Sequence, residues 1–215
     1  MNKLWTFGDS YTENFRYDIW WCKDYLDWKG YIPKVYGQII SEKLNLELIN
    51  IGQGGTNNYQ IFQNICDNIM NFKKNDIVII SWTQLHRFRI VNKESEWEWF
   101  YNDKEHILEK LEKCEYMSKL TIEQIILNRY NNKDKYLEEI KSWELIIKKA
   151  LPNNNLIFWS PFDDDEYGEI IQMFETIKKE TNDTINNPHF SELGQAQLSE
   201  ILLQRLGYAA SKKII

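Results

Sequence analysis

The amino-acid sequence predicts an α/β fold: a three-layer α/β/α sandwich, in which helices cover both faces of a parallel sheet. Short apolar segments rich in strand-forming residues alternate along the chain with longer segments whose apolar residues recur at helical spacing. One short segment, residues 77–81, is almost entirely apolar, as a strand buried on both faces is. Strands that alternate with helices require crossover connections, which make the strands parallel and place helices on both faces.

Each element is predicted from the local pattern of residues. Strands are expected at residues 4–7, 46–51, 77–81 and 155–159. Helices are expected where apolar residues recur every three or four positions, at residues 31–44, 57–70, 136–150, 167–177 and 193–206. Irregular structure is expected at residues 14–31, an aromatic-rich loop, and at 211–215, a tail. The least regular stretch, residues 91–150, is expected to be a helical elaboration on the sandwich.

Length and charge bound the class of protein. A chain of 215 residues fits one domain, residues 1–215, with a full hydrophobic core. The net charge of −6 argues against nucleic acid or an anionic membrane as the main partner. No apolar segment approaches the ~20 residues of a membrane span, and no signal-peptide core follows the N-terminus. We therefore expect a cytoplasmic protein without nucleic-acid or membrane partners, while assembly into an oligomer or a virion stays open.

The residues that commonly bind metals form no recognisable site in the sequence. Cys22, Cys66 and Cys114 are odd in number and widely spaced, so they indicate neither a disulfide framework nor a zinc site. Cys66 lies on the apolar face of the predicted helix 57–70 and is expected to be a buried thiol. The acidic run at residues 163–166 lacks the pattern of a calcium loop and is interpreted as a helix cap. No metal and no other cofactor is expected.

The sequence Gly8-Asp9-Ser10-Tyr11-Thr12 directly follows the first predicted strand. A glycine turn at the end of a strand lifts the next polar side chain out of the sheet, and open α/β sheets bind ligands at this carboxyl edge. A serine at such a place acts as a nucleophile when a base reaches it.

A glycine-rich turn follows the second predicted strand, in Asn50-Ile51-Gly52-Gln53-Gly54-Gly55-Thr56-Asn57-Asn58. The simplest explanation is a turn that needs positive φ angles. A phosphate-binding loop is a weaker alternative, because no lysine follows at the Walker spacing.

A histidine precedes the last predicted helix, in Asn187-Pro188-His189-Phe190-Ser191-Glu192-Leu193-Gly194. Isolated histidines in loops are commonly surface residues, but this one comes after the last strand, where a base for the serine is needed. His86 and His106 are weaker candidates, since the first lies beyond the third strand and the second in a charged segment.

Taken in this order, the motifs resemble the sequence blocks of SGNH (GDSL-type) hydrolases, over nearly the whole chain. The resemblance implies a flavodoxin-like strand order and a small bacterial or phage-type member of that family. It also implies that Ser10 is the nucleophile and His189 the general base. The backbone N–H groups of Ser10 and Gly55 would form the oxyanion hole.

Two departures from the family pattern concern the catalytic groups. The third block of the family has Gly-x-Asn-Asp, whose asparagine amide completes the oxyanion hole, and this chain has Ser81-Trp82-Thr83-Gln84. Thr83 aligns with that asparagine and carries a hydroxyl, and Gln84 carries an amide, so one of them is expected to supply the side-chain donor. Without such a donor the rate typically falls ~10²–10³-fold.

The second departure concerns the acid that orients the histidine. The family places an aspartate three residues before the histidine, where this chain has Asn186. Asp183, six residues before, and a backbone carbonyl are the alternatives. We expect Asn186 to be the third member, although an amide does not stabilise an imidazolium by charge.

Residues around these motifs are candidates for contacts with a substrate. Asp9 and Tyr11 flank the nucleophile, Trp82 follows the third strand, and Arg87 lies a few residues further. Arg87 is suited to bind a carboxylate or a sugar hydroxyl, and an exposed salt bridge is an equally good explanation for it.

The sequence therefore predicts a serine esterase that hydrolyses acyl esters of small molecules or glycans, with carbohydrate acetyl esters as one candidate class. The alternative is a catalytically degenerate SGNH domain that serves as a binding or structural module, for example in a phage particle. The altered third block and the missing aspartate motivate this alternative.

Overall fold

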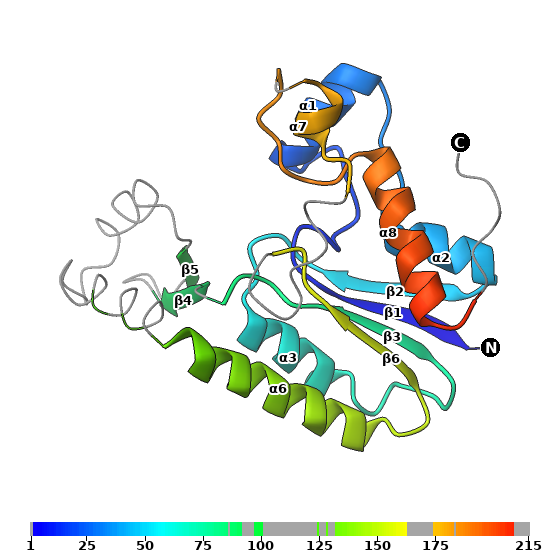
Figure 1. Ribbon diagram of the computed structural model, residues 1–215, viewed down its shortest axis with the longest axis vertical. Helices are drawn as coiled ribbons and strands as arrows, with labels where there is room; N and C mark the ends of the chain where they lie inside the picture. Colours follow the sequence, from blue (N-terminus) through cyan, green and yellow to red (C-terminus); the bar gives the residue numbers. More distant parts are fainter. Residues whose placement is uncertain are drawn as a thin grey trace.

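The computed structural model describes residues 2–85, 87–91, 97–100, 124, 128, 132–162, 174–182 and 184–208. A parallel sheet forms the centre of this part of the chain (Figure 1). Its strands lie in the order β2-β1-β3-β6. Their bounds are β1 Lys3–Gly8, β2 Glu47–Gly52, β3 Ile77–Ser81 and β6 Asn155–Trp159.

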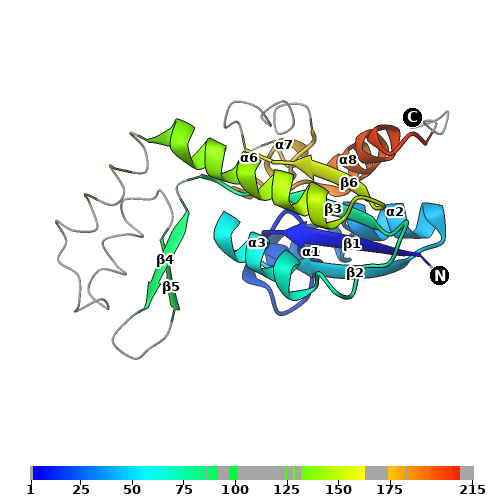
Figure 2. The ribbon, with the colours of Figure 1, turned by 90° about the horizontal axis from the view of Figure 1, so that it is seen from below.

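Helices cover both faces of the sheet, so the predicted three-layer α/β/α sandwich is confirmed (Figures 1 and 2). On one face lie α2 (Tyr36–Leu44) and α8 (Glu192–Arg205), and on the other lie α3 (Asn58–Asp67) and α6 (Lys133–Ala150). Two short helices, α1 (Trp20–Lys29) and α7 (Ile177–Glu180), lie together beyond the carboxyl ends of the strands.

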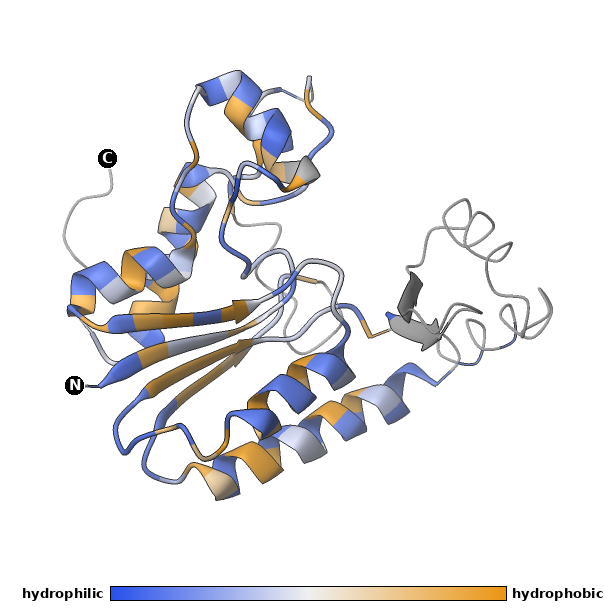
Figure 3. Ribbon diagram, turned by 180° about the vertical axis from the view of Figure 1, so that it is seen from behind, coloured by the Kyte–Doolittle hydropathy of each residue, from blue (hydrophilic) through white to orange (hydrophobic). Residues whose placement is uncertain are grey.

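Side chains along β3 point alternately to the two faces of the sheet, and both faces are buried. Ile77 and Ile79 pack with α2 and α8, whereas Val78 and Ile80 pack with α3 and α6. Apolar residues accordingly dominate the central strands, while the covering helices mix apolar and polar residues (Figure 3). Such strands are expected in parallel sheets, since both of their faces are core.

The strand order places the functional edge of the sheet. Numbered by position along the chain, the four strands of the sheet have the order 2-1-3-4, which is the flavodoxin-like order. Connections leave β1 and β3 in opposite directions, and ligands of such sheets bind beyond the carboxyl ends at this switch point. The serine motif follows β1, and residues 82–85 follow β3.

Three local predictions are wrong. Residues 14–31, expected as a loop, contain α1, which buries Cys22 and Tyr25 and ends at Gly30 in the left-handed conformation. Helix α3 ends at Asp67, so the expected helix 57–70 is too long and Met70 is 91% exposed. Cys66, expected to be buried, is exposed, because it lies one residue past the last buried position of the helix, Ile65.

Part of the expected helical elaboration at residues 91–150 has a different structure. An antiparallel pair, β4 (Phe88–Val91) and β5 (Trp97–Phe100), lies where this elaboration begins. Both strands are rich in the aromatic and β-branched residues that favour strands. Most of residues 101–131 lie outside the described residues, as do the tail and most of the expected helix 167–177. None of the helices in the described ranges is long and apolar enough to cross a membrane.

Candidate active site

The turn that carries Ser10 folds tightly against the end of β1. The Asp9 carbonyl accepts hydrogen bonds from the backbone N–H groups of Thr12 (2.9 Å) and Glu13 (3.0 Å). A Cβ atom on Gly8 would lie 2.2 Å from Thr12 Oγ1 and 2.8 Å from Ser81 Cβ. Only glycine fits there, which is the physical reason for the first residue of the motif. Ser10 itself is 9% exposed.

Asn187 fixes the loop that carries His189. Its Oδ1 atom accepts the backbone N–H of His189 (3.1 Å) and lies 2.9 Å from the ring atom Nδ1. The loop is also bound to α7, because Ile177 donates its N–H to the His189 carbonyl at 2.9 Å. Asn187 is 3% exposed, whereas Asn186 is exposed. The acceptor beside Nδ1 is therefore Asn187 and not the expected Asn186.

Tyr11 brings the two ends of the chain together. The centroid of its ring lies 5.0 Å from the centroid of the His189 ring, and the two ring planes are inclined by 31°. Its hydroxyl donates to the Pro188 carbonyl at 3.3 Å. The residue after Ser10 thus packs directly against the loop of His189, although almost the whole chain separates them in sequence.

The surroundings of His189 keep its imidazole neutral. Burial, followed by the charge of Arg87, lowers the pKa of His189 to about 3. The Asn187 amide turns its oxygen towards this loop, because Oδ1 accepts the backbone N–H of His189. The same oxygen lies beside Nδ1 and can only accept, so the proton of the neutral ring belongs on Nδ1. The Nε2 atom, shielded from solvent, is then the basic nitrogen.

The glycine loop after β2 is braced from the serine turn. Glu13 Oε2 accepts the N–H of Gly54 at 2.7 Å. The Gln53 N–H donates to the Gly8 carbonyl at 3.0 Å, which joins this loop to the end of β1. Gly55 has a φ of 78°, a conformation that a side chain disfavours. The loop is thereby held beside the turn that carries Ser10.

The residues after β3 are tied to both of these loops. Thr83 donates its hydroxyl proton to Asp9 Oδ2 at 2.8 Å. Asn58 pairs with the Thr83 backbone twice, accepting its N–H at 2.7 Å and donating to its carbonyl at 2.9 Å. Because a hydroxyl has one proton, the expected oxyanion donor Thr83 is committed to Asp9 in this structure. Gln84 uses its Oε1 atom to accept from Arg87 Nε at 3.3 Å, and its amide N–H groups are not part of that bond.

A buried ion pair lies at the centre of this arrangement. Arg87 Nη1 is 2.8 Å from Asp9 Oδ2, and the two side chains are 10% and 0% exposed. The same nitrogen is 3.4 Å from the Thr56 carbonyl, and the guanidinium lies over the ring of Phe162 at 5.3 Å. Arg87 therefore joins the β3 exit to the serine turn and the glycine loop.

Three of the expected substrate contacts are buried. Asp9, Tyr11 and Trp82 are at most 5% exposed. Trp82 donates its indole N–H to Oε1 of the buried Glu144 in α6 at 3.0 Å. Arg87 differs, because it borders a cavity.

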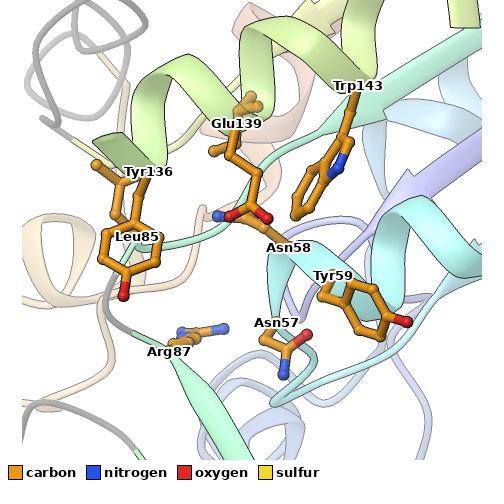
Figure 4. Close-up of a pocket in the computed structure, with 9 residues that line it drawn as sticks. Asn57, Asn58, Tyr59, Leu85, Arg87, Tyr136, Glu139 and Trp143 are labelled. Atoms are coloured by element: carbon orange, nitrogen blue, oxygen red, sulfur yellow. The ribbon is translucent and has the colours of Figure 1, made fainter. Parts of the chain in front are cut away.

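This cavity has a volume of about 160 Å³ and lies between α6, the start of α3 and the β3 exit. Figure 4 shows side chains of α6 reaching towards Asn57, Tyr59 and Arg87. Its lining residues are Asn57, Asn58, Tyr59, Leu85, Arg87, Tyr136, Glu139, Ile140 and Trp143.

Some of the residues singled out in the sequence lie outside the described part of the chain, and some residues of the site had no predicted role. Asp183, His86 and the acidic run at residues 163–166 lie outside the described residues. Within the described ranges, no three His, Cys, Asp or Glu side chains form a group able to hold a metal ion. Sequence reasoning gave no role at the site to Glu13, Asn58 or Asn187, although Asn187 was noted as near the histidine. Asn58 and Asn187 stand inside the quoted motifs, so their position was the available signal.

No protein-family model matches the sequence, and no curated protein matches it either. Among solved structures, the acetylxylan esterase Axe2 from Geobacillus stearothermophilus is 15% identical, with a TM-score of 0.48 over 99% of this chain and 97% of that chain. A protein from Desulfitobacterium hafniense, described as lipolytic and of the G-D-S-L family, is 14% identical, with a TM-score of 0.38 over 95% and 99%.

The acetyl xylan esterase Est2A from Butyrivibrio proteoclasticus is 12% identical, with a TM-score of 0.45 over 97% of this chain and 65% of that chain. These likenesses concern the fold. The strand order and the helices on both faces are those of a flavodoxin-like α/β/α sandwich, which is the fold class that the sequence predicts.

Proposed function

We propose that this protein is a serine esterase that hydrolyses acyl esters, with Ser10 as nucleophile and His189 as general base. The observation that carries the proposal is the packing of the Ser10 turn on the His189 loop through Tyr11, at 5.0 Å between rings. The turn that carries Ser10 and the loop that carries His189 come from opposite ends of the chain and pack together through Tyr11, at the edge of the sheet where such folds bind ligands.

In the proposed mechanism, Ser10 Oγ attacks the ester carbonyl while Nε2 of neutral His189 takes its proton. The backbone N–H groups of Ser10 and Gly55 stabilise the developing oxyanion, with the Gln84 amide as the side-chain donor. His189 then returns the proton to the leaving alcohol, and an activated water hydrolyses the acyl-enzyme by the same steps in reverse. Asn187 holds the imidazole in the reactive tautomer throughout.

A fluorophosphonate probe tests the nucleophile directly. We expect the wild-type protein to be labelled at Ser10 and to hydrolyse p-nitrophenyl acetate, and the Ser10→Ala variant to do neither. Ser160 is a suitable control, because it is a buried serine that follows a different strand, β6. Labelling that survives Ser10→Ala, or a folded wild type that is never labelled, would contradict the proposal.

The second candidate is a non-catalytic SGNH-like module. Two observations favour it: the Thr83 hydroxyl donates to Asp9, and the group described beside His189 Nδ1 is the neutral amide of Asn187. Such a module would bind a glycan or another protein through the same edge and would show no labelling of Ser10.

A further inference from the structure

We propose that the cavity between α6 and the start of α3 is a subsite for one neutral sugar ring, the alcohol part of the ester. This inference rests on the proposed esterase function for its place in catalysis. The cavity is linked to the candidate site through Arg87 in its wall, which is paired with Asp9, the residue before Ser10. Asn57, also in the wall, lies two residues after Gly55.

The size of the cavity limits the ligand to a small group. Its volume of about 160 Å³ is below the ~300–1,000 Å³ of pockets that enclose drug-sized molecules. One ring or a short chain fits such a space, and the rest of a larger substrate would extend into solvent.

The polar lining favours a sugar over an acyl chain. Glu139 and Trp143 reach down from α6 and face Asn57 and Tyr59 at the start of α3 (Figure 4). Asn57 accepts the Gln60 N–H with its Oδ1, so its amide nitrogen provides the donors. An acyl chain would cover these carboxylate and amide groups without hydrogen-bonding them, which is unfavourable. Sugar hydroxyls donate and accept, and therefore satisfy both groups.

Two aromatic side chains of the lining, Trp143 and Tyr59, are suited to contact the apolar face of a sugar ring. Trp143 stacks on Phe62, with 5.0 Å between ring centroids and 8° between planes. Tyr59 lies 6.3 Å from the same indole and is 53% exposed. Rigid rings that are already packed lose little conformational freedom when a ligand binds.

The charge of the lining favours a neutral ligand. Arg87 lies 2.8 Å from Asp9, so its positive charge is paired inside the protein. Glu139 is the other charged side chain of the described lining, so the formal charges of the two cancel and the described lining carries no net charge. A uronate or a sugar phosphate would be repelled by this carboxylate.

Binding to the Ser10→Ala protein tests the subsite without requiring hydrolysis. Calorimetric titrations would use xylobiose, cellobiose and diacetylchitobiose as neutral sugar probes, and hexanoate as the acyl probe. We expect at least one sugar to bind, and Glu139→Gln to weaken its binding about tenfold, the effect of losing one hydrogen bond to a charged group. Glu138→Gln is the matched control, since this neighbour is equally exposed on α6 but does not line the cavity.

Kinetics separate this inference from the proposed function. In the protein that retains Ser10, Glu139→Gln should lower the kcat/KM for an acetylated disaccharide about tenfold. The kcat/KM for p-nitrophenyl acetate should stay unchanged. Ser10-dependent hydrolysis with no sugar bound, or with a preference for long-chain p-nitrophenyl esters, overturns the sugar subsite and leaves the esterase intact. Sugar binding that is weakened by Glu139→Gln in a protein that hydrolyses no ester supports the subsite and overturns the esterase.

Discussion

Asn187 uses one oxygen to hold both the backbone and the ring of His189, at 3.1 and 2.9 Å. An amide oxygen selects the tautomer with the proton on Nδ1, as an aspartate would, and so leaves Nε2 as the base. It lacks the negative charge that stabilises an imidazolium as the proton is transferred. A functional site built in this way keeps the orientation of its base and loses part of the electrostatic stabilisation.

The first prediction separates the two adjacent asparagines. Asn187→Ala should lower kcat at least about tenfold, because general-base catalysis contributes ~10²–10⁴-fold and depends on a fixed imidazole. Asn187→Asp should retain activity, since it keeps an acceptor at the same place. Asn186→Ala is the control and should change kcat less than about twofold. Equal losses in the two alanine variants, measured with p-nitrophenyl acetate, would argue against Asn187 as the orienting residue.

The second prediction concerns the pKa of His189, lowered to about 3 by burial and by Arg87. Between pH 6.5 and pH 3 the unfolded chain binds a proton at this histidine, whereas the folded protein does not. Stability therefore falls with decreasing pH in this window, by up to roughly 1.4 kcal/mol per pH unit. Because the base stays neutral, catalysis should also persist well below pH 6.

Urea unfolding at pH 5 and pH 7 checks this linkage. The difference in unfolding free energy between the two pH values should be smaller in His189→Gln, which lacks the titrating group. Carboxylates contribute equally to both proteins and cancel in the comparison. An unchanged pH dependence in the variant would mean that His189 binds protons equally in the folded and unfolded chains, so that its pKa is not lowered by folding.

At the scale of elements, the sequence predictions are accurate where the pattern of apolar residues is uninterrupted. Strands β3 and β6 have the predicted bounds, because apolar residues buried on both faces leave an uninterrupted pattern. Helix α1 was missed, since its apolar pattern is broken by polar residues; among its described side chains, Cys22 and Tyr25 are buried. Gly30 after the helix was the available stop signal.

From the sequence, candidate site residues could be named only where a local motif singles out one residue. Ser10, Gly55 and His189 stand in recognisable local contexts. The choice between Asn186 and Asn187 depends on which side chain the loop turns inwards, and burial alone decides it. The family spacing favoured the wrong neighbour, because it assumes that the loop has the family's length and path.

At the scale of the whole molecule, the site is assembled by contacts between residues far apart in the sequence. Asp9 accepts from Thr83 and Arg87, which are 74 and 78 positions away. Each of these residues looks unremarkable in its own segment, and an exposed salt bridge was an equally good interpretation of Arg87. The sheet order that places β1 beside β3 is what makes the pair buried. Contacts of this kind do not follow from local patterns.

The last prediction tests whether this pair stabilises the whole fold. Arg87→Gln leaves the fully buried Asp9 carboxylate without its countercharge and should lower the unfolding free energy by about 3–5 kcal/mol. Asp9→Asn in the same protein removes that uncompensated charge, so the double variant should recover much of the loss. A double-mutant cycle by urea unfolding then gives the coupling between the two side chains. Lys34→Gln is the control, because its pair with Glu42 is more than half exposed and such pairs contribute less than about 1 kcal/mol. If Arg87→Gln destabilises no more than Lys34→Gln, the pair does not stabilise the fold, and Arg87 would have to be explained by substrate binding alone.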